Sequence, residues 1–483
     1  MSASKTSPLT WPKALLLIVC AAGCFHLAYA PTRFNFLKLL IIGYVTCLVQ
    51  LGKLGSVRRA FYAGLAAGLL CVAPELSCFW TIFNWAAIPL WIVLAFWTGL
   101  FTAMTHGILK RFGNAWVLLL IPCVWTGLEY FRSELYYLKF SWLNVGYAFS
   151  GWRVVPFKML GMYGVGFLAA FCGSLFLIRN WLYGMVGTAV VFGACAAIAP
   201  PPARAEPAKL HVAGMQLEFP TERALPMLLD RLLSKHPEAD LFVLSEYTLD
   251  GPVPDTLKNW CKKNLRFLAV GGKDPAANGN FFNTIFVISP KGEIVFRQAK
   301  SVPIQFFKDG LPAPRQSVWN SPWGKIGFCI CYDLSYTRVT DRLVKMGAQM
   351  LIVPTMDVAD WGLHEHQLHA RVAPVRAAEY NIPIFRLASS GISQVVTRDG
   401  AVVDSAGFPG ENEMIAGAFD LNSEGSLPVD RFAAPVCVVI SGMLMLALVF
   451  PRFGNQRRKS SDAAEAEFSS EENPDKSQPA KSS

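Results

Sequence analysis

The sequence predicts an α/β layered domain joined to an α-helical transmembrane bundle of about eight spans. Hydrophobic residues make up 53% of the 483 residues and charged residues only 16%, a balance too apolar for a soluble protein of this length. Apolar runs fill residues 1–200, and one more lies near 433–450. In the polar region between them, short strand-like stretches alternate with helical periodicity, which is typical of an α/β domain.

Each apolar run is a candidate membrane helix, because about 20 apolar residues cross the hydrocarbon core. The resulting division is a transmembrane domain at 1–200, a polar domain at 201–430, a final transmembrane helix at 431–452 and a disordered tail at 453–483. The tail is rich in Ser, Glu and Lys, which cannot build a core. The first seven spans are expected near residues 12–30, 35–51, 59–78, 85–108, 115–131, 155–178 and 181–199.

Basic residues are distributed unevenly between the two sets of loops. With an even number of spans both termini lie on one side, and that side carries Lys53, Arg58–Arg59, Lys110–Arg111 and the basic cluster at 452–459. The opposite short loops carry fewer basic residues. The positive-inside rule therefore predicts that both termini are cytoplasmic and that the polar domain lies outside the cytoplasm.

Several classes of protein and site are disfavoured. The chain has a formal charge of +10 but no basic stripe with interleaved aromatics, so nucleic acid is not an expected partner. Only three of the 12 cysteines lie in the polar domain and none forms a Cys-x-x-Cys pair, which argues against a disulfide framework or a zinc site. The segment His364–His369 resembles a metal motif, but Leu368 stands where a zincin requires histidine. No metal is expected.

Elements of the polar domain follow from period and turn signals. A proline-rich linker, 200–207, precedes it, and residues 301–322 contain four prolines and predict a long loop. Strands are expected at 210–217, 241–244, 267–271, 283–287, 293–298, 325–331, 350–354 and 384–387, helices at 222–236, 255–264, 335–347 and 364–380, and a hairpin turn at 399–400.

Three chemically reactive side chains stand at predicted strand ends. Glu246 ends a buried strand, Lys300 follows the strand at 293–298, and Cys331 stands at a strand-to-helix elbow. Cys329 is expected on the same side of the strand as Cys331, but deeper. A poorly solvated carboxylate suits proton transfer, a cation stabilises an oxyanion, and a thiolate is a nucleophile. Reactive groups of α/β sheets gather at the carboxyl ends of strands, so the three are expected to form one site.

This ordered set resembles the Glu–Lys–Cys triad of the nitrilase, or carbon–nitrogen hydrolase, superfamily. With membrane spans on both sides of the domain, the chain is similar to the apolipoprotein N-acyltransferases. The resemblance also covers the segment Phe140–Tyr147, the opening of the domain at Val212–Gln216 and the helix after the nucleophile. It implies an αββα nitrilase-like sandwich as the fold of the polar domain.

The resemblance also implies an activity. Glu246 would act as base, Cys331 as nucleophile, and Lys300 with the Tyr332 backbone N–H would stabilise the oxyanion. The expected partners are a phospholipid acyl donor, a diacylglyceryl-apolipoprotein acceptor and the bilayer, with no cofactor, and the expected location is a bacterial inner membrane with the domain in the periplasm. A membrane-tethered amidase that uses water remains the alternative.

The chain departs from the family pattern between Lys300 and Cys331. The auxiliary glutamate expected there is absent, which leaves Asp309 and Asp333 as candidate auxiliary carboxylates. Lys308 is a second candidate for the lysine role. The aromatic loop 132–153 has two interpretations, an interfacial belt or a lipid-facing part of the active site.

Overall fold

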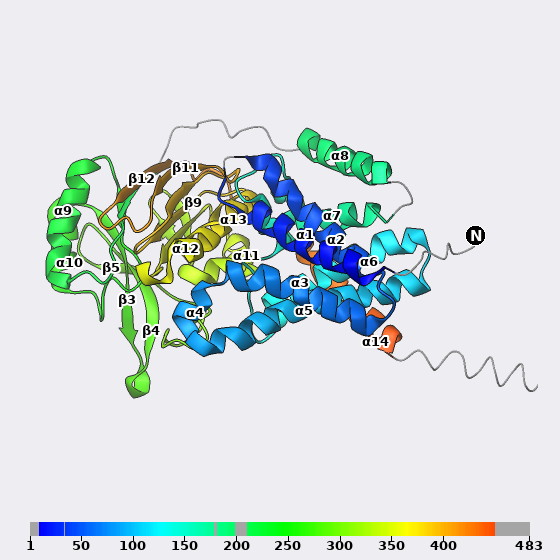
Figure 1. The fold of residues 1–483 in the computed structure, drawn as a ribbon. Coiled ribbons are helices and arrows are strands. Elements are labelled where there is room, and N and C mark those ends of the chain that lie inside the picture. The colour runs from blue at the N-terminus through cyan, green and yellow to red at the C-terminus, as the bar shows by residue number, and fades with distance from the viewer. Residues whose placement is uncertain (1–8, 33, 178–180, 199–209, 450–483) are drawn as a thin grey trace, which may run out of the picture.

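The computed structural model describes residues 9–32, 34–177, 181–198 and 210–449. A bundle of helices forms one half of the molecule and two β-sheets with their covering helices form the other (Figure 1). The predicted linker at 200–207 and the predicted disordered tail at 453–483 lie outside the described residues. This combination confirms the predicted fold class.

Apolar helices occupy the regions of the predicted spans. Six of them in the described part of the chain are long and apolar enough to cross a membrane, and the 3₁₀ and α-helical segment Asn35–Leu51 is a shorter apolar helix. The helices are α1 (Trp11–Tyr29), α2 (Leu40–Leu51), α3 (Val57–Glu75), α4 (Cys78–Phe83), α5 (Ala87–Arg111), α6 (Asn114–Tyr130), α7 (Phe157–Leu175), α8 (Trp181–Ile198) and α14 (Asp430–Val449).

Two mixed six-stranded sheets form the polar domain, in the orders β12-β1-β2-β3-β4-β5 and β11-β10-β9-β8-β7-β6. The first contains β1 (Leu210–Met215), β2 (Leu241–Val243), β3 (Phe267–Pro275), β4 (Phe281–Ile288), β5 (Ile294–Ala299) and β12 (Met414–Phe419). The second contains β6 (Val318–Ser321), β7 (Gly324–Phe328), β8 (Met350–Thr355), β9 (Ile384–Ala388), β10 (Ser393–Val396) and β11 (Val402–Ala406).

The sheets pack face to face and helices cover their outer faces. Val212, Val243 and Ile285 of the first sheet share an apolar cluster with Ile326 and Ile352 of the second, which is the core of an αββα sandwich. The covering helices are α9 (Leu225–Lys235) and α10 (Asp255–Asn264) on the first sheet, and α11 (Thr337–Lys345), α12 (Leu363–Ala370) and α13 (Val372–Tyr380) on the second.

Four local expectations were wrong. The predicted helix 364–380 is broken at Arg371, because Pro374 lacks the N–H that a continuous helix needs. Strand β6 lies inside the predicted loop 301–322, and no strand was predicted for β12, which pairs antiparallel with β1. The strand before the nucleophile ends at Phe328 instead of residue 331.

The aromatic loop 132–153 joins the two halves of the molecule. Trp142 donates from Nε1 to Ser335 Oγ at 3.0 Å, and the Tyr332 hydroxyl donates to the Lys139 carbonyl oxygen at 3.2 Å. Trp142 is buried. The loop is therefore packed between the apolar helices and the elbow at Cys331. An interfacial belt would instead face lipid.

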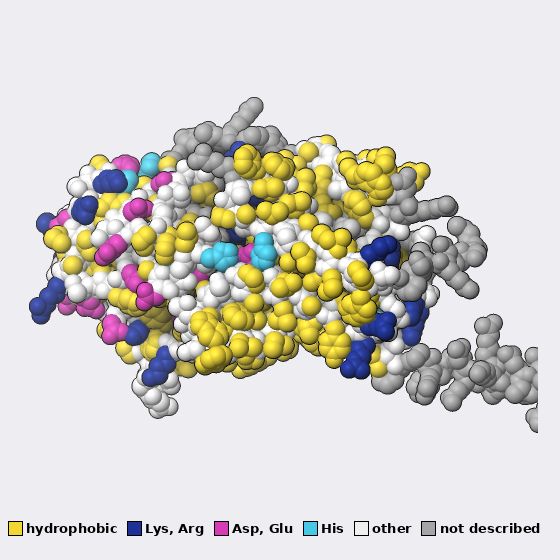
Figure 2. Space-filling view, viewed as in Figure 1, with side chains coloured by type: hydrophobic (Ala, Val, Ile, Leu, Met, Phe, Trp, Pro, Cys, Tyr) yellow, Lys and Arg dark blue, Asp and Glu magenta, His cyan; other side chains and the backbone are white. Residues whose placement is uncertain are grey.

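The surface differs between the two halves. Hydrophobic side chains dominate the exposed surface of the helical half, while acidic side chains lie over the sheets (Figure 2). Lys and Arg side chains gather at the end of the helical bundle that lies farthest from the sheets (Figure 2). Lys and Arg side chains also lie among the acidic side chains over the sheets (Figure 2).

Candidate active site

The three predicted side chains meet in the interior of the sandwich. Glu246 follows β2, Lys300 follows β5 and Cys331 follows β7. Parallel pairing of β2 with β3, and two antiparallel steps from β3 to β5, point β2 and β5 the same way. Their carboxyl ends therefore share one edge, and the second sheet brings Cys331 to the same place. All three side chains are buried.

Glu246 is held by three hydrogen-bond partners, one of which is a cation. Its Oε1 accepts from Lys300 Nζ at 2.9 Å and from Asn283 Nδ2 at 2.6 Å. Its Oε2 accepts from the Met356 backbone N–H at 2.7 Å. Burial and the nearby charge of Asp309 raise the pKa of Glu246, although Lys300 opposes this shift. A carboxylate with a raised pKa is a stronger base.

Lys300, and not Lys308, occupies the site. The Lys300 side chain is 0% exposed, and its Nζ lies 2.9 Å from Glu246 Oε1 and 2.8 Å from Asp309 Oδ2. Lys308 is exposed on the loop. Burial alone would lower the pKa of Lys300, but the charges of Glu246, Cys331 and Asp309 raise it well above its usual value. Lys300 is therefore a fixed cation.

Cys331 stands at a strained elbow. Its φ of 52° is in the left-handed region, which costs free energy for a residue with a Cβ and is common at functional sites. Cys331 packs in the core between the sheets, whereas Cys329 packs on the helix-covered side. The expectation that both point the same way was wrong, because strand alternation ends at Phe328.

The thiol of Cys331 is held protonated in the resting site. Burial and the charge of Glu246 raise its pKa well above the usual value, and Lys300 opposes this only in part. The strand does not lead directly into a regular helix, because the short 3₁₀ segment Cys331–Ser335 follows it and α11 begins only at Thr337. A nucleophilic role for Cys331 would therefore require a base, and Glu246 is the carboxylate whose charge acts most strongly on the thiol.

The two candidate auxiliary carboxylates have different contacts. Asp309 lies 2.8 Å from Lys300 Nζ, and its Oδ1 accepts from the Tyr247 hydroxyl at 2.7 Å. Asp333 instead accepts the backbone N–H groups of Ser301 and Val302 at 2.9 and 2.8 Å. Asp309 therefore acts on the charge of the site, and Asp333 fixes the loop that carries Lys300.

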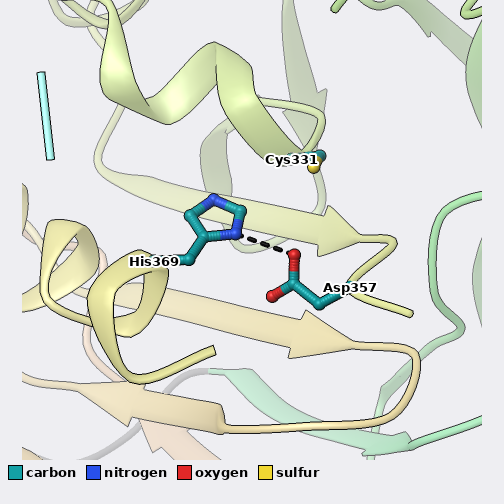
Figure 3. A group of neighbouring side chains, drawn as sticks. All are labelled: Cys331, Asp357 and His369. Carbon is teal, nitrogen blue, oxygen red and sulfur yellow. Dashed lines mark hydrogen bonds and ion pairs between the residues drawn. The ribbon is translucent and has the colours of Figure 1, made fainter. Parts of the chain in front are cut away.

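A second cluster, which the sequence reasoning missed, lies beside Cys331 (Figure 3). Asp357 follows β8, and its Oδ1 accepts from His369 Nδ1 of α12 at 2.8 Å. Its Oδ2 accepts from Arg386 of β9 at 2.5 Å. The strand-end rule that selected Glu246 could have selected Asp357, since the predicted strand 350–354 ends just before it.

This cluster contains three potential metal ligands. One ligand atom each from Cys331, Asp357 and His369 lies within 4.8 Å of the others. Both Asp357 oxygens are already engaged, one by His369 and one by the buried Arg386 guanidinium. The adjacent Arg386 cation would repel a metal ion, so these contacts fit an ion-pair network better than a ligand set.

An apolar cavity adjoins the elbow. Its walls come from membrane-side helices, from the aromatic loop and from the polar domain. Tyr332, the residue after the nucleophile, forms part of the wall. The other lining residues used below are Phe79, Phe83, Leu94, Phe140, Trp142, Phe306, Phe307, Tyr336, Trp361 and Glu365.

Comparison with known proteins identifies the family. The family model for the apolipoprotein N-acyltransferase N-terminal domain matches residues 21–175, and that for carbon-nitrogen hydrolase matches residues 221–428. The chain belongs to the apolipoprotein N-acyltransferase family. At the level of this family, its activity is the N-acylation of lipoproteins, and several apolar helices agree with an integral membrane protein.

Individual relatives are distant. The apolipoprotein N-acyltransferase of Geobacter metallireducens is 22% identical over 432 residues, which cover 75% of this chain and 81% of the relative. That of Bdellovibrio bacteriovorus is 24% identical over 213 residues, 36% of this chain and 39% of the relative. The crystal structure of a carbon-nitrogen hydrolase from Helicobacter pylori G27 aligns at 18% identity with a TM-score of 0.39, covering 44% of this chain and 89% of its own.

The contacts of Asp309 and Asp333 lead to a first prediction. Asp309→Asn removes one of the two carboxylates at Lys300 Nζ and is expected to slow thioester formation by more than about 10-fold, or about 1.4 kcal/mol of barrier. Asp333→Asn is expected to lower the thermal stability of the domain first, because it weakens three backbone hydrogen bonds. Single-turnover kinetics and thermal melts of both variants check this. Wild-type kinetics in Asp309→Asn would show that Asp309 does not contribute to the reaction.

Proposed function

We propose that the chain transfers a fatty acyl chain from a membrane phospholipid to the N-terminal amine of the lipid-modified cysteine of an apolipoprotein, through a thioester on Cys331. One observation carries this proposal. An apolar cavity, whose walls come from both the polar domain and the membrane helices, reaches Tyr332, the residue that follows Cys331 of the Glu246–Lys300–Cys331 cluster. A water-soluble amide would not need such walls, whereas an acyl chain would.

The first half-reaction is acylation. Glu246 takes the proton of the Cys331 thiol, and Sγ attacks the ester carbonyl carbon of the phospholipid. Lys300 and the Tyr332 backbone N–H stabilise the oxyanion. When the C–O bond breaks, Glu246 returns the proton to the leaving lysophospholipid oxygen, and the thioester remains. The acyl chain lies along Phe79, Phe83 and the other apolar residues of the cavity.

The second half-reaction is aminolysis of the thioester. The α-amino nitrogen of the apolipoprotein cysteine attacks the same carbonyl carbon, the C–S bond breaks, an amide forms, and a proton from the amine passes to Cys331 Sγ and restores the thiol. The cavity surrounds the thioester with apolar and aromatic side chains, which limits its hydrolysis by water. No step requires a metal or an organic cofactor.

The proposed location is a bacterial inner membrane, with both termini in the cytoplasm and the 201–430 domain in the periplasm. The distribution of basic residues supports this orientation. In intact cells, a membrane-impermeant thiol reagent is expected to label Lys262→Cys on the exposed face of α10 and not Gly113→Cys between α5 and α6. The Gly113 position is a matched control, because a side chain there meets no neighbour within 4 Å. Protection of residue 262 with labelling of residue 113 would reverse the orientation.

The experiment that tests the activity separates transfer from hydrolysis. Purified protein is incubated with phospholipid alone and then with a diacylglyceryl-cysteine peptide, and the products are followed by mass spectrometry. A stable acyl adduct that the peptide discharges into a triacylated product is the expected result. Release of free fatty acid at one rate, with or without peptide, would favour the alternative, a membrane-tethered hydrolase of the nitrilase type.

A further inference from the structure

Two buried polar atoms on one face of α12 lack hydrogen-bond partners. They are Oε2 of Glu365 and Nε2 of His369, and both side chains are 2% exposed. Residues four apart in a helix lie above one another on the same face. Because a buried polar atom without a partner is unfavourable, two such atoms one helical turn apart point to a ligand that would satisfy both.

His369 is fixed next to the nucleophile. Its Nδ1 lies 2.8 Å from Asp357 Oδ1, and one of its ring nitrogens lies within 4.8 Å of Cys331 Sγ. The ring stacks on Trp142 with centroids 4.6 Å apart. Since the Asp357 carboxylate can only accept, Nδ1 carries the proton and Nε2 has a free lone pair. The imidazole is therefore oriented as a proton acceptor.

Glu365 connects this face of α12 to the apolar cavity. It lines the cavity together with Trp142. Its Oε2 lies 3.3 Å from His366 Nδ1, but that nitrogen bonds to the Gly362 carbonyl oxygen at 2.8 Å. Burial and the charge of Asp357 raise the pKa of Glu365 well above its usual value. A polar group that enters from the cavity could therefore hydrogen-bond to Oε2 of Glu365.

We propose that Glu365 and His369 bind the primary amine of the acyl acceptor, and that His369 Nε2 takes a proton from that amine as it attacks the Cys331 thioester. This inference rests on the proposed function and adds a base for its second half-reaction. The new C–N bond forms, the C–S bond breaks, and the proton passes from nitrogen to His369 and from His369 to Cys331 Sγ, which restores the thiol. Glu246 then serves acylation alone.

The surroundings favour an amine over water. An isolated water molecule needs two to four polar partners, and most of the cavity wall beyond Glu365 consists of apolar and aromatic side chains such as Trp142, Tyr332 and Trp361, with Lys139 and Gln305 as its other charged and amide side chains. The acceptor amine is carried by a lipid-modified residue, whose chains gain free energy from the apolar walls. A primary amine can also contact two groups one helical turn apart.

The test measures the two half-reactions separately in the full-length protein. His369→Ala and His369→Gln are loaded with phospholipid and then mixed with the diacylglyceryl-cysteine peptide. Loading is expected within about 3-fold of wild type, while discharge should slow about 100-fold, the lower range for a lost general base. Added imidazole should restore part of the discharge in His369→Ala. Gln367→Ala, on the opposite side of α12, is the matched control.

Two further readouts distinguish a proton acceptor from a structural residue. Burial lowers the pKa of His369, so wild-type discharge should fall only below the usual imidazole range as pH drops, and the His369 variants should lose this acid limb. The titratable and charged groups around His369 are Asp357, Arg386, His366 and Cys331, and Glu365 lies one helical turn before it on the same face of α12. Glu365→Leu should raise the peptide KM about 10-fold, a larger change than it makes to loading, and Glu365→Gln should raise the KM less.

The outcomes separate this inference from the proposed function. Normal discharge in both His369 variants would overturn the inference and leave the transferase intact. Equal loss of loading and discharge in variants with wild-type thermal stability, with no imidazole rescue, would also overturn it. If wild type itself forms no thioester, the proposed function fails before the second half-reaction is reached.

Discussion

Replacing Cys331 by alanine is expected to abolish both the acyl adduct and peptide acylation, a loss of at least about 10⁴-fold. The charges of Glu246 and Lys300 both act on the Cys331 thiol. The adduct in wild type should be stoichiometric, labile to hydroxylamine and absent from Cys331→Ala. Intact-protein mass spectrometry after incubation with phospholipid alone measures it directly.

Cys329→Ala is the matched control for this prediction. Cys329 is buried two residues earlier, but its side chain packs with the helix-side core and not between the sheets. Its truncation should lower stability by about 1 kcal/mol and leave the adduct in place. An adduct that persists in Cys331→Ala, or disappears only in Cys329→Ala, would mean that the elbow has been assigned the wrong nucleophile.

The sequence was sufficient to find the first set of site residues because of strand direction. Glu246 and Lys300 follow strands that run the same way in one sheet, and such strands end at a common edge whatever the loops between them do. The geometry at Cys331 was beyond this argument. The positive φ of Cys331 interrupts the alternation of side chains along the strand. Neither periodicity nor propensity predicts the end of a strand to within two or three residues.

The second cluster at the site could not be assembled from the sequence, since it depends on long-range packing. Asp357 follows β8, His369 lies in α12 and Arg386 lies in β9, yet each residue alone resembles a solvated polar position. The histidine-rich segment 364–369 drew attention as a metal motif. In the structure the last histidine of this segment, His369, pairs with Asp357, and the first, His364, pairs with Glu75 at the end of α3.

The relation between the two halves was also not predictable from patterns. The aromatic loop 132–153 has the composition of an interfacial belt, and composition cannot distinguish lipid from protein as the apolar partner. In the structure Trp142 contacts both Ser335 and His369. Trp142, which belongs to the helical half of the molecule, therefore helps to shape the site around Cys331.

The second large effect is expected at Lys300. Lys300→Met keeps most of the side-chain volume but removes the cation between Glu246 and Asp309, each within 2.9 Å of Nζ. Loss of an oxyanion donor alone typically slows a reaction about 10²–10³-fold. Two buried carboxylates would also be left without their shared cation, which costs about 3–5 kcal/mol when one partner of a buried ion pair is removed. Thioester formation should therefore fall below detection, together with a lower melting temperature.

Lys308→Met is the matched control, because Lys308 lies in the loop that follows Lys300. Lys308 is exposed, so its replacement should leave melting temperature and thioester formation within about 3-fold of wild type, since an exposed charge contributes little. Lys300→Met/Asp309→Asn adds a diagnostic step. Removing the Asp309 charge relieves part of the repulsion in the site, so the double variant should melt higher than Lys300→Met while staying inactive. Recovery of stability without activity separates the ion pair's structural contribution from the catalytic need for a cation, whereas an active Lys300→Met protein would show that the oxyanion is stabilised elsewhere.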